Sequence, residues 1–308
     1  MKDNEMYLAI DIGGSKYLVG IVDRAGCIYA RKKRMCKGMD ISRLLQTIIA
    51  DGKQLLKELR LEIHAVGITI PGLADCESGY WVESTFSGVS NIPMREIFQR
   101  AFEKQVFLDN DANACALAEK VFGHCKNKSN FIYLTVSNGI GGAIFYNGAL
   151  YRGQTGNAGE FGHMIVVENG RLCQCGNHGC LEKHAAGPAI VQNYHEFGGS
   201  ADVKNVEEIA ALAEAGDRIA QRTFELESDY LAKTLGNAVN VLNIDCIVIG
   251  GGVSLAGKHF IPQLAEKLKK QIYRKANPDI SVVATPLGYE GGLYGAAALA
   301  YKGLQKLV

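Results

Sequence analysis

Short apolar runs interrupted by pairs of glycine recur along the chain. Residues 7–12 and 17–23 flank Gly13-Gly14, and this pattern is typical of two β-strands joined by a hairpin turn. The pattern restarts where the apolar run 130–136 leads into a second glycine-rich turn before 143–146. We interpret the repeat as a structural duplication, with two α/β domains that each open on a turn of the size that holds a phosphate. Further strands are expected near 27–34 and at 65–70, 106–108 and 246–249.

Helices are predicted where apolar residues recur at helical spacing. Residues 40–60 show this spacing, and Asp40 or Ser42 is available as the N-terminal cap. Other helices are expected at 112–121, 217–242 and 291–303.

Composition and charge narrow the range of functions. The chain has 308 residues, which suggests two domains, and its formal charge of +1 argues against capture of nucleic acid or of an anionic membrane. The basic cluster at 31–34 follows a strand-like run and is explained more simply as a solvated sheet edge. No apolar run reaches the ~20 residues that span a bilayer, and the first five residues lack the pattern of a signal peptide. We therefore expect a cytoplasmic protein with no membrane or nucleic-acid partner.

Glycine-rich turns can cradle a phosphate because their backbone N–H groups point inward and glycine allows close approach. Asp11 at the mouth of the first turn could hold Mg²⁺ through water, and Lys16 could bring a positive charge to a phosphate. The alternative for each turn is a plain hairpin. Three such turns, each after a buried strand, favour nucleotide binding, although none fits the Walker or dinucleotide patterns.

Three polar residues follow the strand at 106–108. Asp111 opens a helix, where a carboxylate usually serves as a cap. Because Asp109 or Asn110 could cap equally well, Asp111 is a candidate to orient and deprotonate a substrate hydroxyl, as phosphoryl transfer to an alcohol requires.

Nine cysteines, an odd number, fit a reducing compartment in which most thiols are free. Cys173, Cys175 and Cys180 fall within eight residues, and with His163 they make the Cys₃His composition of a closed, structural zinc site. A disulfide within the loop is the main alternative, but it would leave the third thiol alone. His178 is an alternative fourth ligand.

Two carboxylates flank this cysteine loop. Glu160 precedes it and Glu182 follows it. They either hydrogen-bond a polyol in a cleft or face solvent.

Six segments spread over nearly the whole chain carry these motifs in a fixed order. They are Asp11-Ile-Gly-Gly-Ser-Lys16, Asn110-Asp111-Ala-Asn113, Ser137-Asn-Gly-Ile-Gly-Gly142, Gly156-Asn-Ala-Gly-Glu160-Phe-Gly-His163, Cys173-x-Cys175-Gly-x-x-Gly-Cys180-x-Glu182 and Ile249-Gly-Gly-Gly252. Together they resemble the ROK family of sugar kinases and related repressors, which has the hexokinase/actin-like fold. The resemblance implies two α/β domains of the actin-like (ribonuclease H-like) ATPase type with an interdomain cleft. We expect a smaller domain of residues 1–118 joined by 291–308, and a larger domain of residues 119–290 that carries the zinc loop.

The resemblance also implies a function and a role for each motif. The implied activity is ATP-dependent phosphorylation of a hexose hydroxyl, with C6 of glucose as the first choice, supported by Mg²⁺ and a structural zinc ion. Asp111 would be the catalytic base. Asn110, Glu160, His163 and Glu182 would bind the sugar, with His163 also ligating zinc beside Cys173, Cys175 and Cys180. The nucleotide and its metal would be held by Asp11, Gly13, Gly14, Ser15, Lys16, Asn138, Gly139, Gly141, Gly142, Gly251 and Gly252.

Three positions depart from the family pattern. Ser15 and Asn138 each stand where the family usually has Thr, and segment 84–93 lacks the Asn-Leu-x-x-Trp pattern of many glucose kinases. N-acetylmannosamine, N-acetylglucosamine, allose and fructose are therefore kept as alternative sugars. A non-catalytic sugar-sensing or regulatory ROK protein is the alternative of another class, although a first strand near Tyr7 leaves no room for the DNA-binding domain of the repressors. We also expect a homodimer.

Overall fold

The chain folds into two compact units. The computed structural model describes residues 5–84, 88–255 and 260–307. The first unit comprises Met1–Asn127, Arg152–Ala158 and Glu290–Val308, and the second comprises Lys128–Tyr151 and Gly159–Tyr289. Segment 152–158 therefore belongs to the first unit although the residues on both sides of it in the chain belong to the second. The domain boundaries expected from the sequence stay a prediction.

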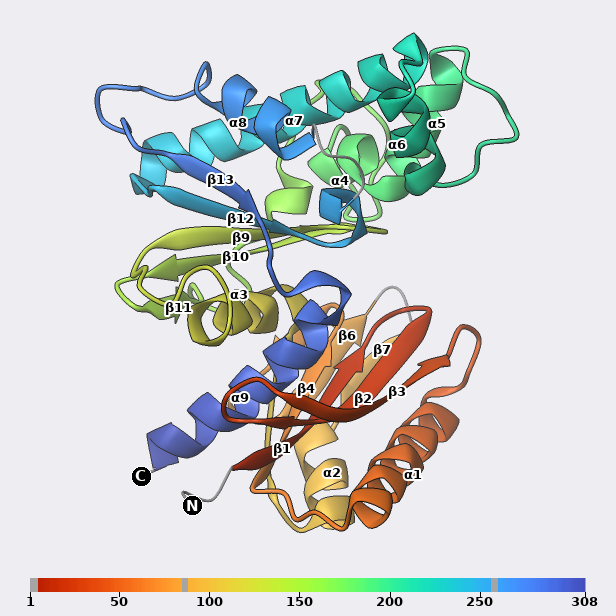
Figure 1. The fold of residues 1–308 in the computed structure, drawn as a ribbon, viewed down its shortest axis with the longest axis vertical. Coiled ribbons are helices and arrows are strands. Elements are labelled where there is room, and N and C mark those ends of the chain that lie inside the picture. The colour runs from red at the N-terminus through yellow and green to blue at the C-terminus, as the bar shows by residue number, and fades with distance from the viewer. Residues whose placement is uncertain (1–4, 85–87, 256–259, 308) are drawn as a thin grey trace. The chain divides into compact units, whose positions relative to one another are not determined.

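A five-stranded sheet forms the centre of the first unit (Figure 1). Its strand order is β3-β2-β1-β4-β8, in which β1, β2 and β3 are antiparallel and β4 and β8 run parallel to β1. The expected hairpin is confirmed, and its turn is closed by the Gly13 N–H, which donates to the Lys16 carbonyl at 2.9 Å. The strands are β1 (Met6–Ile12), β2 (Lys16–Asp23), β3 (Ile28–Met35), β4 (Ala65–Ile70) and β8 (Gln105–Asn110).

Successive side chains of β1 point to opposite faces of this sheet, and helices pack on both faces. Leu8 and Ile10 belong to a core with α1 and α2, whereas Ala9 packs with α9. Gly67 permits the close approach of α9, since a Cβ there would lie 1.8 Å from the Ala296 carbonyl oxygen. Asp40 caps α1, as one of the two expected caps, by accepting from the Arg43 N–H. The helices are α1 (Ile41–Leu59), α2 (Met94–Phe102), α3 (Asp111–Val121) and α9 (Gly291–Leu307).

A small second sheet in this unit was not expected from the sequence. It consists of β5 (Leu73–Asp75), β6 (Tyr80–Ser84) and β7 (Val89–Ile92), in that order. Its fully buried Trp81 donates from Nε1 to the Pro71 carbonyl at 2.8 Å. Of the unusual segment 84–93, Ser84 and Val89–Ile92 lie in this sheet and Pro93 is the N-cap of α2, while residues 85–87 fall outside the described residues.

The second unit repeats the strand order of the first. Its five-stranded sheet runs β11-β10-β9-β12-β13, again with three antiparallel strands followed by two that are parallel to the first strand of the unit. This match confirms the structural duplication inferred from the two glycine turns. The strands are β9 (Phe131–Val136), β10 (Ile140–Tyr146), β11 (Ala149–Tyr151), β12 (Cys246–Gly250) and β13 (Ser281–Ala284).

Helices of the second unit form one large core with this sheet. The long helix expected at 217–242 is α7 (Arg218–Leu242), and it begins at the capping side chain of Asp217. The other helices are α4 (Leu181–Ala185), α5 (Gly187–Glu196), α6 (Val206–Glu214) and α8 (Phe260–Leu268), with short 3₁₀ turns η1 (Phe161–His163), η2 (Gly252–Leu255) and η3 (Gly288–Glu290). Among the described residues, no helix combines the length and apolar character needed to cross a membrane.

Candidate functional site

The first glycine turn places a carboxylate beside a helix N-terminus. Asp11 lies at the end of β1, directly before the turn that contains Gly13, Gly14 and Ser15, and Lys16 begins β2. The Thr69 hydroxyl donates to Asp11 Oδ1 at 2.7 Å. Burial raises the pKa of the Asp11 carboxyl, while the hydrogen bond from Thr69 and the charge of Lys16 lower it. A cation bound at this carboxylate would offset the cost of burying its charge.

Close packing at Asp11 requires a glycine on α9. A Cβ on Gly292 would lie 2.4 Å from the carboxylate carbon and oxygens of Asp11. The first turn of α9 therefore approaches the carboxylate closely. A carboxylate near a helix N-terminus is electrostatically favoured.

Asp109, near the end of β8, lies at the same level of the sheet as Asp11. Asp11 is in register with Thr69 on β4, and Thr69 is in register with Asp109 on β8. The parallel strands thus bring the first glycine turn and the polar residues 109–111 to one edge of the sheet. Asn110 precedes α3 as its N-cap, and Asp111 is its first residue. The Ala112 N–H is shared between Asn110 Oδ1 at 2.9 Å and Asp111 Oδ1 at 2.8 Å.

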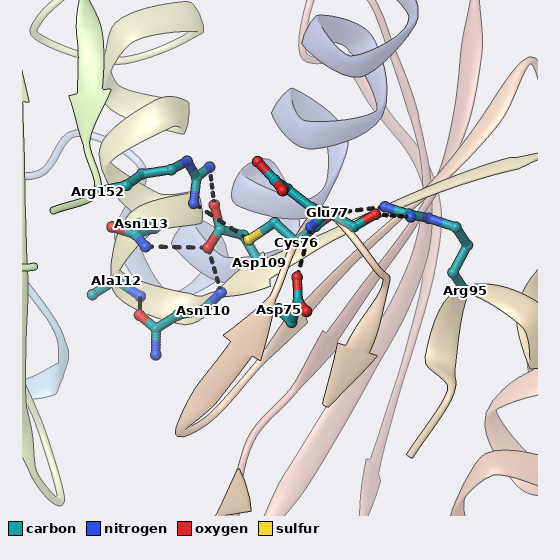
Figure 2. Close-up of polar contacts among 9 residues, drawn as sticks. All are labelled: Asp75, Cys76, Glu77, Arg95, Asp109, Asn110, Ala112, Asn113 and Arg152. Carbon is teal, nitrogen blue, oxygen red and sulfur yellow. Dashed lines mark hydrogen bonds and ion pairs between the residues drawn. The ribbon is translucent and has the colours of Figure 1, made fainter. Parts of the chain in front are cut away.

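Asp109 is a buried carboxylate with three donors around it (Figure 2). Its side chain is 1% exposed. Oδ1 accepts from the Asn110 N–H at 2.8 Å and from Asn113 Nδ2 at 3.1 Å, and Oδ2 accepts from Arg152 at 2.6 Å. From the sequence, Asp109 was one of two alternative caps for the helix, and Arg152 was not singled out. No local spacing connects these two residues, which are 43 positions apart.

The second glycine turn is held by two helix N-termini of its own unit. The Ser137 N–H donates to the Gly139 carbonyl at 2.9 Å, and the Ser137 carbonyl accepts from the Gly187 N–H of α5 at 2.7 Å. Glu182 of α4 accepts from the Ile140 N–H through Oε2 at 3.1 Å. A Cβ on Gly139 would lie 2.6 Å from that oxygen, so the turn and the carboxylate are in close contact. Of the other expected turn residues, Asn138 lies in the turn, whereas Gly141 and Gly142 lie within β10.

A cavity of about 400 Å³ opens beside this turn. The third glycine segment borders it at Gly252, and Gly251 adopts a φ of 81° that favours glycine. A Cβ on Gly251 would lie 2.2 Å from the Val136 carbonyl oxygen. The cavity is lined by Ser137, Asn138, Gly187, Pro188, Val191, Lys204, Asn205, Val206, Glu207, Gly252 and Val253.

The Cys₃His residues form one cluster. The ligand atoms of His163, Cys173, Cys175 and Cys180 lie within 4.8 Å of one another, and all three cysteines are free thiols. Cys175 and Cys180 have sulfurs 3.5 Å apart, and Cys173 Sγ lies 3.7 Å from His163 Nδ1. Tetrahedral zinc with bonds of about 2.3 Å to sulfur would separate its ligands by about 3.8 Å, so the donor set and its spacing fit zinc. His178 instead contacts the Gly170 carbonyl at 3.0 Å through Nδ1.

Hydrogen bonds from Arg171 support the cysteine loop. Its guanidinium donates to the Lys183 carbonyl at 3.0 Å, and to Asn193 and Glu196 at 2.7 Å. Its N–H donates to Nε2 of His184, whose pKa is lowered by burial and by the charge of Arg171. The neutral imidazole is the form that accepts this bond. These contacts fix the loop on α4 and α5, and sequence spacing did not reveal them.

Three of the expected sugar-binding residues, Glu160, His163 and Glu182, belong to the second unit. His163 directs Nδ1 toward Cys173, and its Nε2 lies 3.8 Å from Glu160 Oε2. The Glu160 side chain is 59% exposed, whereas that of Glu182 is 16% exposed and contacts the second glycine turn. The expected residues therefore gather in two groups. Asp11, Gly13, Gly14, Ser15, Lys16, Asn110 and Asp111 lie in the first unit, and the remaining residues lie in the second.

The chain is similar over most of its length to known proteins. The model of the ROK family matches residues 7–303. A glucokinase from Thermotoga maritima is 33% identical over 312 residues, which cover 95% of this chain and 96% of that protein. The crystal structure of a ROK family glucokinase from Streptomyces griseus in complex with glucose and AMPPNP has a TM-score of 0.87 and 28% identity, and the match covers 97% of this chain and 100% of that one. A xylose repressor from Caldicellulosiruptor bescii is 30% identical over 88% of this chain and 72% of its own length. The mixed α/β structure and its solved relatives confirm the expected actin-like ATPase fold class.

Proposed function

Because the chain belongs to the ROK family, we propose that it is an ATP-dependent sugar kinase that transfers the γ-phosphate of MgATP to a hexose hydroxyl. The proposal rests on one observation: the first glycine turn and the polar residues 109–111 lie at the same edge of the first sheet. Asp11, the first glycine turn and the Asn110-Asp111 pair lie at the ends of strands β1 and β8. The strand register pairs Asp11 with Thr69 and Thr69 with Asp109. A metal-binding carboxylate, a phosphate turn and a base are the parts that phosphoryl transfer to an alcohol needs.

In the first unit we assign Asp111 as the general base. Its carboxylate accepts the proton of the sugar hydroxyl as that oxygen attacks the γ-phosphate. Asn110 holds the start of α3, donates from Nδ2 to the Gly72 carbonyl at 2.8 Å and is assigned to the sugar. Asp11 would hold Mg²⁺, whose charge offsets the charge that develops on the phosphoryl oxygens. Gly13, Gly14, Ser15 and Lys16 are assigned to the phosphates.

In the second unit we assign the second turn to the phosphates and the adjacent cavity to the nucleoside. A volume of about 400 Å³ is in the range of small-molecule sites. Both apolar and polar side chains line the cavity, as recognition of a base and a ribose requires. Asn138 and Gly252 border it directly. The remaining residues assigned to nucleotide binding are Gly139, Gly141, Gly142 and Gly251.

We assign the Cys₃His cluster to a structural zinc ion. Four protein ligands leave no position for a reactive water, so the metal would fix the loop instead of taking part in chemistry. With Nδ1 of His163 turned toward the cluster, Nε2 stays on the side of Glu160. Zinc binding would thereby orient His163 for a sugar hydroxyl, beside Glu160 and Glu182.

Glucose is the first choice of sugar, and a sugar panel tests the proposal. ADP release should be measured with glucose, N-acetylmannosamine, N-acetylglucosamine, allose and fructose at one low, equal concentration. We expect the highest rate with glucose. A higher rate with another of these sugars would overturn the choice of glucose and retain the kinase. No rate above background with all five would favour the sugar-sensing alternative, which the identity to the xylose repressor supports. The expected homodimer stays a prediction.

A further inference from the structure

Arg152 anchors a segment that is separated in the chain from the rest of its unit. It follows β11 and begins segment 152–158. This segment belongs to the first unit, whereas the residues before and after it in the chain belong to the second. The Ala158 N–H donates to the Arg152 carbonyl at 3.1 Å, so the segment folds back on itself. A contact that fixes Arg152 therefore also restrains Ala158, which lies two residues before Glu160 in the chain.

The guanidinium of Arg152 contacts two side chains from other parts of the first unit (Figure 2). One terminal nitrogen is 2.6 Å from Asp109 Oδ2, and the other is 3.3 Å from Cys76 Sγ. Asp109 is almost completely buried, while the Arg152 side chain is 36% exposed. A carboxylate buried to this degree needs a counter-charge, because an unpaired buried charge is strongly unfavourable.

A short series of contacts leads from Arg152 to the proposed base. Asp109 accepts from Arg152 through one oxygen and from the Asn110 N–H through the other. Asn110 then accepts from the Ala112 N–H, which Asp111 shares. Each of these bonds restricts the backbone that carries Asp111.

We propose that Arg152 is a positioning residue for the reaction, and this inference rests on the proposed kinase function. It neutralises Asp109 and fixes the strand end from which Asp111 projects. Through the same contact it fixes segment 152–158, which belongs to the same unit. Its effect on Asp111 passes through Asp109 and Asn110.

Arg152→Met tests the proposal, with Arg95→Met as the matched control. Arg95 lies in the same cluster and donates to the Cys76, Glu77 and Val106 carbonyls, but it does not contact Asp109 (Figure 2). We expect Arg152→Met to lower kcat per folded molecule by about 10- to 100-fold, since small displacements of a catalytic group cost up to about 10² in rate. The KM for ATP should stay within about twofold, and Arg152→Lys should recover part of kcat. Arg95→Met should lower the melting temperature and leave kcat within about twofold.

A double variant separates positioning from simple stability. Arg152→Met combined with Asp109→Asn removes the unpaired buried charge but does not restore the contact between the two segments. We expect its melting temperature to recover toward that of the wild type while kcat stays low. Recovery of both quantities, or a kcat of Arg152→Met within about twofold of the wild type, would overturn the inference.

Amide hydrogen exchange decides the inference independently of turnover. Exchange at 109–113 and 153–158 should be faster in Arg152→Met, and in Arg152→Lys to a lesser degree, than in Arg95→Met. Unchanged protection at both stretches would overturn the positioning role, whatever the activity. A wild-type protein that phosphorylates no sugar would instead refute the proposed function. If Arg152→Met does not fold, Arg152→Lys and the double variant provide the same comparisons.

Discussion

Glu182 is the carboxylate whose replacement best tests how the metal loop and the nucleotide site cooperate. It lies two residues after Cys180, which we assign to zinc, at the start of α4, and it accepts a hydrogen bond from the Ile140 N–H of the second glycine turn at 3.1 Å. We predict that Glu182→Ala weakens the binding of nucleotide as well as sugar. A residue that only contacted the sugar would affect sugar binding alone.

The size of the effect follows from the contact that is lost. A hydrogen bond to a charged group contributes about 1.5–3 kcal/mol, and one between neutral groups about 0.5–1.5 kcal/mol. Ile140 is 6% exposed, so in Glu182→Ala water cannot readily satisfy its N–H. If the turn must be ordered before it binds phosphate, about 1.4 kcal/mol of this cost already weakens nucleotide binding tenfold. Glu182→Gln keeps an oxygen that can accept the bond, so we expect a loss of about threefold or less for nucleotide.

Isothermal titration calorimetry with MgAMPPNP and, separately, with glucose measures both effects without turnover. Glu168→Ala is the control, because Glu168 is an exposed carboxylate on the same loop. We expect it to leave both affinities unchanged. Sugar affinity should fall in both Glu182 variants. If Glu182→Ala binds MgAMPPNP as tightly as the wild type, the Ile140 contact does not order the turn and the reasoning is wrong.

Three further predictions concern the base, the metal and the core. Asp111→Asn should lower kcat by about 10²–10⁴ while sugar affinity changes little, and near-normal kcat in a steady-state assay would remove Asp111 from the role of base. Metal analysis should give about one zinc per chain, and Cys175→Ser should lose the metal and lower the melting temperature; an equal zinc content in both proteins would contradict the assigned ligand set. Glu227 on α7 is fully buried, neither of its carboxylate oxygens has a hydrogen-bond partner among the described residues, and burial raises its pKa well above the usual range. The native state therefore keeps a proton that the unfolded state releases near pH 4, so stability falls as pH rises from there, by up to about 1.4 kcal/mol per pH unit. Glu227→Gln does not titrate, and its gain in unfolding free energy over the wild type should be larger at pH 8 than at pH 5 in urea titrations; an equal gain at both values would contradict this explanation.

The main strands and the long helices were predictable because their signals are local. Glycine pairs between apolar runs identified the hairpins β1–β2 and β9–β10, and helical spacing identified α1 and α7. The small sheet β5–β7 has strands of three to five residues, which are too short for a clear alternation. Its position depends on tertiary contacts such as the bond from Trp81 to Pro71.

The candidate site was predictable to the extent that its residues are neighbours in sequence. The cysteine spacing predicted a Cys₃His cluster, and the structure brings the four side chains together. The contacts of Arg152 with Asp109 and of Glu182 with Ile140 join residues 43 and 42 positions apart. Such pairs depend on which strands and helices become neighbours, and a single sequence contains no local signal for that.

The structure gives each of the polar residues 109–111 a different position, although the sequence alone did not distinguish their roles. Any of the three could have capped α3, and in the structure Asn110 is the N-cap while Asp111 is the first helical residue. Asp109 turns instead into the interior, as alternation along a strand requires of a residue next to Asn110. Two carboxylates this close would repel each other if neither had a counter-charge, and Arg152 supplies one to Asp109. The ion pair thus holds Asp109 in the interior, whereas Asp111 takes the first position of α3, and it is from this position that we assign Asp111 the role of base.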